Sequence, residues 1–257
     1  VFFGNGMDTT QEKSVDILDN LKRDTQPLIS LPRQKDCTIF DLAYNTNELG
    51  WTDLLQGYVQ AISSDTSGFW RIMARLQIMP AVLQRLFSDI AVTLDKINYI
   101  SDSDLRIQAE QYRHEIRDNH KKVILVPHSQ GNFYANEAYN LLASLIPISS
   151  NNIELVSVAN PDSFVAGDSP YTTLYGDVIL IVPGRQDPNT DITGTPCSVN
   201  GQLPGTNSFG CHDFIGSYLT GTISKPQILS QIISAIPIQS VSLSLPNTGS
   251  VVEGDVD

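Results

Sequence analysis

The sequence predicts an α/β protein in which helices cover both faces of a mostly parallel central sheet. Strand-like segments alternate along the chain with segments whose apolar residues recur at helical spacing. The runs VILVP and VILIVP are continuously apolar, which is typical of strands buried on both faces. The sequence contains no internal repeat that would indicate a solenoid or a propeller. These observations favour a single α/β domain.

The expected elements follow from these patterns in chain order. Short apolar or β-branched runs predict strands at 1–4, 37–44, 122–127, 153–159 and 177–182. Helical periodicity predicts helices at about 10–23, 101–120, 131–146, 212–220 and 225–236. Together these elements place the α/β domain at residues 1–236.

A helical insertion of about 50–100 separates the second expected strand from the third. This region exceeds an ordinary connection and carries apolar stripes together with Met73 and Met79. One interpretation is a lid over an acyl pocket, with methionine as an adaptable lining. The other is a packed helical layer, and the sequence favours neither.

Charge narrows the possible partners. The formal net charge is −12, whereas a nucleic-acid partner requires a basic face. No apolar run reaches 18 residues, so no membrane span is expected.

Cys197 and Cys211 flank a loop rich in Gly, Pro, Ser and Asn. A disulfide closing about 15 residues would stabilise such a loop by on the order of 3 kcal/mol. It would also indicate an oxidising, hence extracellular, location. The alternative is two separate thiols. Cys37 is expected to be buried in a strand or to pair with a cysteine outside this sequence.

The stretch VILVPHSQGNF places Ser129 between a strand and a helix. Such a sharp turn presents its central side chain at the carboxyl edge of the sheet, beside the N–H groups of the helix start. Gly131 supplies the compact residue required two positions later, whereas Pro127 stands where G-x-S-x-G has its first glycine. The pattern predicts a nucleophile; the alternative is a helix N-cap.

A serine nucleophile needs a base, which is expected after Ser129 and after an acid in the chain. His212 is the histidine that follows Ser129 at a distance. His114 and His120 are expected to be solvated on a polar helix, and His128 is expected to pack at the turn. His212 is therefore the predicted base.

An aspartate must orient the base and stabilise its charged form. Asp187 follows the expected strand 177–182 and is the predicted acid. Asp162 follows the preceding strand and is the alternative. Asp177 is expected to begin its strand, at the wrong edge of the sheet. The candidates considered are Asp162, Asp168, Asp177, Asp187 and Asp191.

Two backbone N–H groups are expected to form an oxyanion hole. Gln130 follows the nucleophile and supplies one of them. The loop GNGMD after the first strand should supply the other, because its glycines allow close approach to a substrate.

Taken together, these motifs resemble α/β-hydrolases, nearest to secreted bacterial lipases and esterases. NGM at 5–7 is similar to the HGM loop of that group, with Asn5 in place of His, and HSQG is similar to its elbow. HDF before a helix resembles its histidine loop; SQG and a disulfide between acid and histidine also resemble cutinases. The resemblance covers about residues 1–236. It implies Met7 N–H as the second oxyanion donor and an acyl-enzyme, without metal or organic cofactor.

Residues 237–257 differ in composition from the domain. SVVEGD resembles the start of a Calx-beta domain, an extracellular β-sandwich repeat. The segment is thus interpreted either as a linker into such a repeat, in a longer modular protein, or as a frayed tail.

The sequence thus predicts a secreted lipase- or esterase-like hydrolase acting on lipid or other ester substrates. Acyl transfer or thioester cleavage by the same triad is an alternative. A non-catalytic surface module that retains the fold is another.

Overall fold

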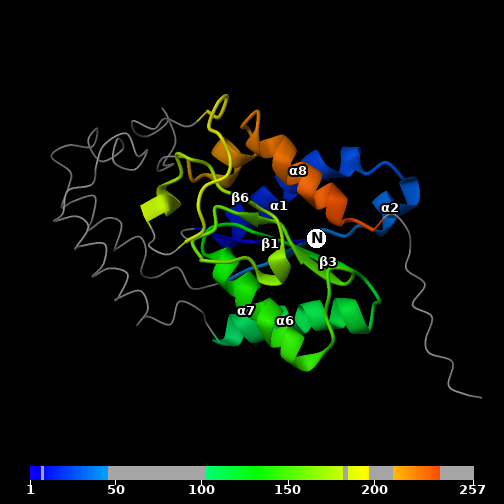
Figure 1. Cartoon of the computed structure of the whole chain (residues 1–257). Coiled ribbons are helices and arrows are strands. Elements are labelled where there is room, and N and C mark those ends of the chain that lie inside the picture. Colours follow the sequence, from blue (N-terminus) through cyan, green and yellow to red (C-terminus); the bar gives the residue numbers. More distant parts are fainter. Residues whose placement is uncertain (7–8, 46–101, 182–184, 197–210, 238–257) are drawn as a thin grey trace, which may run out of the picture.

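The computed structural model describes residues 1–6, 9–45, 102–181, 185–196 and 211–237 (Figure 1). The predicted helical insertion of about 50–100 and the predicted tail lie outside these residues, apart from the first position of the tail.

The central sheet has four parallel strands in the order β2-β1-β3-β4. Their bounds are β1 Phe2–Gly4, β2 Asp41–Ala43, β3 Val123–Pro127 and β4 Ile153–Leu155. A second parallel pair joins β5 Ser157–Val158 to β6 Tyr171–Thr172. An isolated parallel bridge between His128 and Val158 connects the end of β3 to β5. The carboxyl ends of these parallel strands therefore lie along one edge.

Alternate side chains of β1 and β3 enter two separate cores, as the period of a strand requires. Phe3, Ile124 and Val126 belong to one buried cluster. Phe2 and Leu125 belong to the other. Both faces of the sheet are therefore apolar, which explains the continuous run VILVP.

Two helices cover each face. Apolar residues of α1 Gln11–Thr25 and α8 Ser224–Ala235 enter the first cluster. Those of α6 Asp102–Arg117 and α7 Gly131–Leu145 enter the second. Figure 1 shows α1 and α8 on one side of the strands and α6 and α7 on the other. The predicted α/β class and four of the five predicted helices are confirmed, whereas the helix predicted at 212–220 is a short π-helix, η4. The remaining elements are η1 Gln26–Leu28, α2 Pro32–Cys37, η2 Ala166–Asp168, η3 Val178–Ile181 and the π-helix η4 Phe214–Tyr218.

Two expectations are wrong. The segment VILI at 178–181, predicted as part of a strand, forms the 3-10 helix η3. Short β6 at Tyr171–Thr172 stands in its place next to β5. Cys37 ends α2 and is an exposed free thiol, not a buried strand residue. The run at 178–181 forms no strand at all, whereas the strand predicted at 37–44 forms only at Asp41–Ala43, because tertiary packing overrides local β-propensity.

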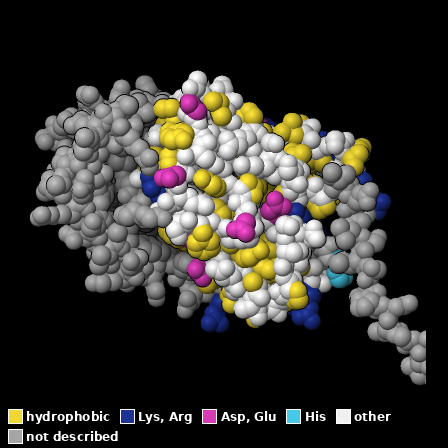
Figure 2. All heavy atoms as spheres, viewed as in Figure 1, with side chains coloured by type: hydrophobic (Ala, Val, Ile, Leu, Met, Phe, Trp, Pro, Cys, Tyr) yellow, Lys and Arg dark blue, Asp and Glu magenta, His cyan; other side chains and the backbone are white. Residues whose placement is uncertain are grey.

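The surface shows no gathering of acidic side chains in the view of Figure 2, where Asp and Glu are spread singly over the described residues. None of the helices in the described part of the chain has the length and apolar character needed to cross a bilayer.

Candidate active site

Ser129 occupies the turn between β3 and α7, in a backbone conformation that serine rarely adopts. Its φ is +54°, and such a left-handed residue costs on the order of 1–3 kcal/mol. Its N–H donates to Val158 O over 3.1 Å. The side chain is fully buried. The strained turn is what the nucleophile prediction requires.

Asn132, in the first turn of α7, holds this turn in place. Its Nδ2 donates to the carbonyl oxygens of Ser129 and Val158, both at 2.9 Å. Its Oδ1 accepts a hydrogen bond of 2.6 Å from the Ser157 hydroxyl. Asn132 was not predicted from the sequence; the signal was an amide side chain three residues after the nucleophile, in the first turn of the following helix.

Pro127 departs from the G-x-S-x-G pattern and lies opposite a glycine of the neighbouring strand. It pairs with Gly4 of β1. A β-carbon on Gly4 would lie 3.4 Å from Pro127 Cα, which is ordinary contact. Gly4 is therefore not needed to make room for Pro127.

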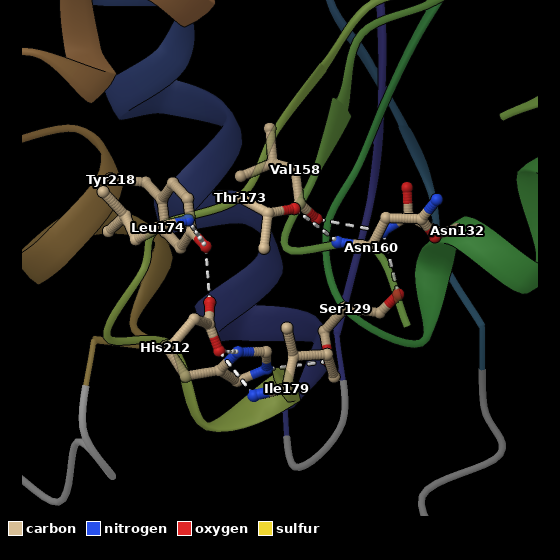
Figure 3. Close-up of polar contacts among 10 residues, drawn as sticks. Ser129, Asn132, Val158, Asn160, Thr173, Leu174, Ile179, His212 and Tyr218 are labelled. Atoms are coloured by element: carbon tan, nitrogen blue, oxygen red, sulfur yellow. Dashed lines mark hydrogen bonds and ion pairs between the residues drawn. The ribbon is translucent and has the colours of Figure 1, made fainter. Parts of the chain in front are cut away.

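The side chains of Ser129, His212 and Asp177 form a continuous hydrogen-bonded chain. His212 Nε2 lies 2.8 Å from Ser129 Oγ, and His212 Nδ1 lies 2.7 Å from Asp177 Oδ1. Figure 3 shows the ring of His212 directed toward Ser129. Asp177 is fully buried, whereas the His212 side chain is 18% exposed. The structure thus brings together the predicted nucleophile and base.

The predicted acid is wrong: Asp177, not Asp187, contacts His212. Because 178–181 is a 3-10 helix, Asp177 does not begin a strand. It follows β6 at the carboxyl edge of the strands, where an acid is needed. The backbone oxygen of Asp187 accepts from the Tyr171 hydroxyl at 3.1 Å.

Asp162, the alternative acid, caps its own turn. Its Oδ1 accepts from Ser163 N at 2.7 Å, and its Oδ2 accepts from Asn136 Nδ2 at 2.9 Å. These contacts tie the turn after β5 to α7, so Asp162 has a local structural role.

Two further donors hold Asp177. Ile179 N donates to Oδ1 over 2.7 Å, and the Tyr218 hydroxyl donates to Oδ2. Tyr218 is fully buried at the end of η4, and its hydroxyl oxygen accepts from Leu174 N at 3.1 Å (Figure 3). Burial and then the nearby Asp177 raise the pKa of Tyr218 well above its ordinary value. Tyr218 therefore remains a hydrogen-bond donor.

His128 packs at the elbow, as predicted. Its ring centroid lies 4.9 Å from that of His212 and 5.2 Å from that of Phe214. Burial, followed by the charge that His212 can carry, lowers the pKa of His128 well below 6.5. His128 is accordingly a neutral packing partner of the proposed base. His114 and His120 are exposed, as predicted, but His120 lies beyond the end of α6 and not on it.

The loop after β1 lies directly beside the nucleophile. A β-carbon on Gly6 would stand 2.9 Å from Ser129 Cβ and 2.8 Å from His128 Nδ1. Gln130 is the N-cap of α7 and places its backbone at the start of that helix. Met7, the other predicted oxyanion donor, lies outside the described residues, so the hole stays a prediction.

Asn5 and Asn45 fix this loop by pairing across the strand ends. Asn45 N donates to Asn5 Oδ1, and Asn45 Nδ2 donates to Asn5 O, both over 2.8 Å. Asn5 Nδ2 donates in turn to Asn45 O at 3.2 Å. Both side chains are buried. Asn5, which replaces the histidine of the HGM loop, thus ties that loop to the end of β2.

Two further predictions concern a disulfide and the absence of a metal site. Cys211 is fully buried immediately before His212, but Cys197 lies outside the described residues, so the Cys197–Cys211 bridge stays a prediction. Within the described ranges, no cluster of three or more His, Cys, Asp or Glu side chains could hold a metal ion.

The chain matches no family model, no curated protein and no solved structure.

Proposed function

We propose that this protein is a serine hydrolase of the α/β-hydrolase type, which cleaves carboxylic esters through an acyl-enzyme formed on Ser129. The observation that carries the proposal is the chain Ser129–His212–Asp177, whose two links measure 2.8 and 2.7 Å. These are hydrogen-bond distances between a nucleophile and a base, and between that base and its orienting acid.

In the proposed first step, Ser129 Oγ attacks the ester carbonyl carbon while its proton passes to His212 Nε2. The tetrahedral intermediate collapses as the carbon–oxygen bond to the alcohol breaks, and His212 returns the proton to the departing alkoxide. Throughout, the Nδ1–H of His212 donates to Asp177 Oδ1, whose negative charge stabilises the imidazolium.

In the second step, a water molecule gives its proton to His212 Nε2 and attacks the acyl carbonyl. Ser129 Oγ leaves and recovers that proton, and the carboxylic acid is released. The negative oxygen of each intermediate would be stabilised by the predicted donors Gln130 N–H and Met7 N–H.

The substrate is proposed to be a lipid or another carboxylic ester, and the location extracellular. The ester class is supported by the side chains of Ser129, His212 and Asp177, which are arranged as in acyl transfer to a serine. The location rests on the predicted disulfide, because such bonds persist in oxidising compartments.

The test is hydrolysis of p-nitrophenyl esters of increasing acyl length by the wild type and by Ser129→Ala. Loss of the attacking oxygen should lower kcat by on the order of 10⁶-fold while the melting temperature stays close to the wild-type value. A fluorophosphonate should label the wild type at Ser129 and leave the variant unlabelled. Equal activity of the two proteins would refute the mechanism.

A further inference from the structure

The geometry points to Tyr218 as a positioning residue that holds the carboxylate of Asp177 in the orientation which His212 needs. This inference rests on the proposed function and adds a fourth side chain to the triad. The residue touches no reacting atom and acts through Asp177.

Hydrogen-bond donors reach both carboxylate oxygens of Asp177. His212 Nδ1 and Ile179 N both lie 2.7 Å from Oδ1. Tyr218 donates to Oδ2. The carboxylate is thus held at both oxygens, and the hydroxyl of Tyr218 opposes rotation of the group about its Cβ–Cγ bond.

The direction in which the Tyr218 hydroxyl donates its proton is set by a second hydrogen bond. Leu174 N–H donates to the hydroxyl oxygen at 3.1 Å. A hydroxyl that accepts from one side directs its own proton elsewhere, and Asp177 lies at hydrogen-bond distance in that direction. The backbone of Leu174 therefore sets the direction in which Tyr218 donates.

Tyr218 also connects the segment that carries the base to the segment that carries the acid. His212 and Tyr218 lie on one short segment, joined by the π-helix η4, whose N-cap Asp213 accepts from Gly216 N. Leu174 and Asp177 lie on another segment, three residues apart after β6. The single tyrosine hydroxyl contacts both residues of the second segment (Figure 3). It therefore fixes the segment of the base to the segment of the acid. π-Helical turns of this kind are frequent at functional sites.

The test compares Tyr218→Phe with Tyr112→Phe. Tyr112 is a matched control, because it is equally buried and its hydroxyl bonds Gln108 Oε1 at 3.4 Å, but it belongs to the cluster on the opposite face of the sheet. Turnover of p-nitrophenyl butyrate is measured per active site, with the sites counted by fluorophosphonate titration, so that unfolded molecules do not contribute.

We expect Tyr218→Phe to lower kcat on the order of 10-fold, as loss of a hydrogen bond to a charged group does, with KM nearly unchanged. Tyr112→Phe should leave both constants unchanged. In the background of Asp177→Asn, the same Tyr218→Phe change should lower kcat no further, because the tyrosine acts through the carboxylate. Wild-type kcat in Tyr218→Phe, or an additive loss in the double variant, would overturn the inference and leave the proposed function intact.

A readout independent of turnover separates the two proposals. The ¹H resonance of His212 Nδ1–H reports its hydrogen bond to Asp177. It should shift in Tyr218→Phe and not in Tyr112→Phe. An unchanged resonance would overturn the positioning role. If the wild type neither hydrolyses esters nor reacts with the fluorophosphonate, the proposed function fails, and the resonance alone decides whether Tyr218 positions Asp177.

Discussion

Gly131 lies so close to Gly4 that a β-carbon on Gly131 would stand 2.7 Å from the Gly4 carbonyl oxygen. The same carbon would lie 2.8 Å from Asn5 O. Both are backbone atoms, which cannot move aside as the end of a side chain can. The start of α7 thus packs directly on the end of β1, and any side chain at 131 would push the nucleophile turn out of place.

Gly131→Ala should therefore destabilise the protein by about 1–3 kcal/mol, the usual cost of overpacking. Gly4→Ala is the matched control, because its β-carbon would find its nearest neighbour at 3.4 Å. Urea unfolding midpoints of the two variants provide the measurement. Equal midpoints would show that the start of α7 packs less closely on the end of β1 than the distances from Gly131 indicate.

Much of this site could be predicted from the sequence, because its strongest signals are local. Ser129 is flanked by an apolar strand and a compact Gly131, and His212 follows at a distance in a distinct HDF motif. The loop after the first strand was expected to approach the substrate because it contains Gly6, and Gly6 does lie beside Ser129, while the oxyanion role of this loop stays a prediction.

The acid could not be predicted, because its position depends on tertiary packing. VILI at 178–181 has the composition of a strand but forms a 3-10 helix, while the strand role passes to Tyr171–Thr172. Assigning 177–182 to a strand put Asp177 at its start and so at the wrong edge. The β-forming residues in YTT were the signal that could have corrected this. Tyr218 was missed for a related reason, since nothing local marks a helical tyrosine as the partner of a distant aspartate.

Substituting each aspartate in turn tests whether Asp177 or Asp187 is the acid that orients His212. Asp177→Asn should lower kcat on the order of 10⁴-fold, because His212 loses the carboxylate that orients it and stabilises its charge. Asp187→Asn should change kcat little, because Asp177 is the aspartate that lies 2.7 Å from His212 Nδ1. The measurement is p-nitrophenyl ester turnover beside thermal melting; the reverse order of activities would restore Asp187 as the acid.

The pair Asn5–Asn45 should matter for both stability and turnover. Asn45→Ala removes the Nδ2 bond to Asn5 O and leaves a buried carbonyl short of a partner. We expect a loss of about 1–3 kcal/mol in unfolding free energy and a fall in kcat, because the loop that contains Gly6 is no longer fixed beside Ser129. Calorimetry and turnover by the folded protein measure the two effects.

Asn152→Ala is the control for this asparagine. Asn152 also bonds two backbone groups, Ser149 N and Pro147 O, but it precedes β4 at the opposite edge of the sheet. The Asn152→Ala variant should have a lower unfolding free energy than the wild type and the same kcat. If both variants keep wild-type turnover, the pairing of Asn5 with Asn45 has no part in catalysis.

His128 should make the folded protein sensitive to mild acid. Burial, the charge of His212 and that of Lys13 lower the pKa of His128 well below its ordinary value of 6.5. The unfolded chain takes up a proton near pH 6.5, whereas folded His128 does not, so the unfolded state binds more protons in the window below that pH. The free energy of unfolding must then fall as the pH drops below about 6.5, by up to about 1.4 kcal/mol per pH unit for one proton.

The test measures the free energy of unfolding in urea at pH 7 and at pH 5.5. Over this interval His128→Asn should lose about 1 kcal/mol less unfolding free energy than the wild type. The control is His120→Asn, which removes an exposed imidazole at a position with φ of +52° that asparagine tolerates. The unfolding free energy of His120→Asn should fall over the same pH interval as much as that of the wild type. If the unfolding free energy of His128→Asn also falls as much as that of the wild type, the His128 ring takes up its proton in the folded state.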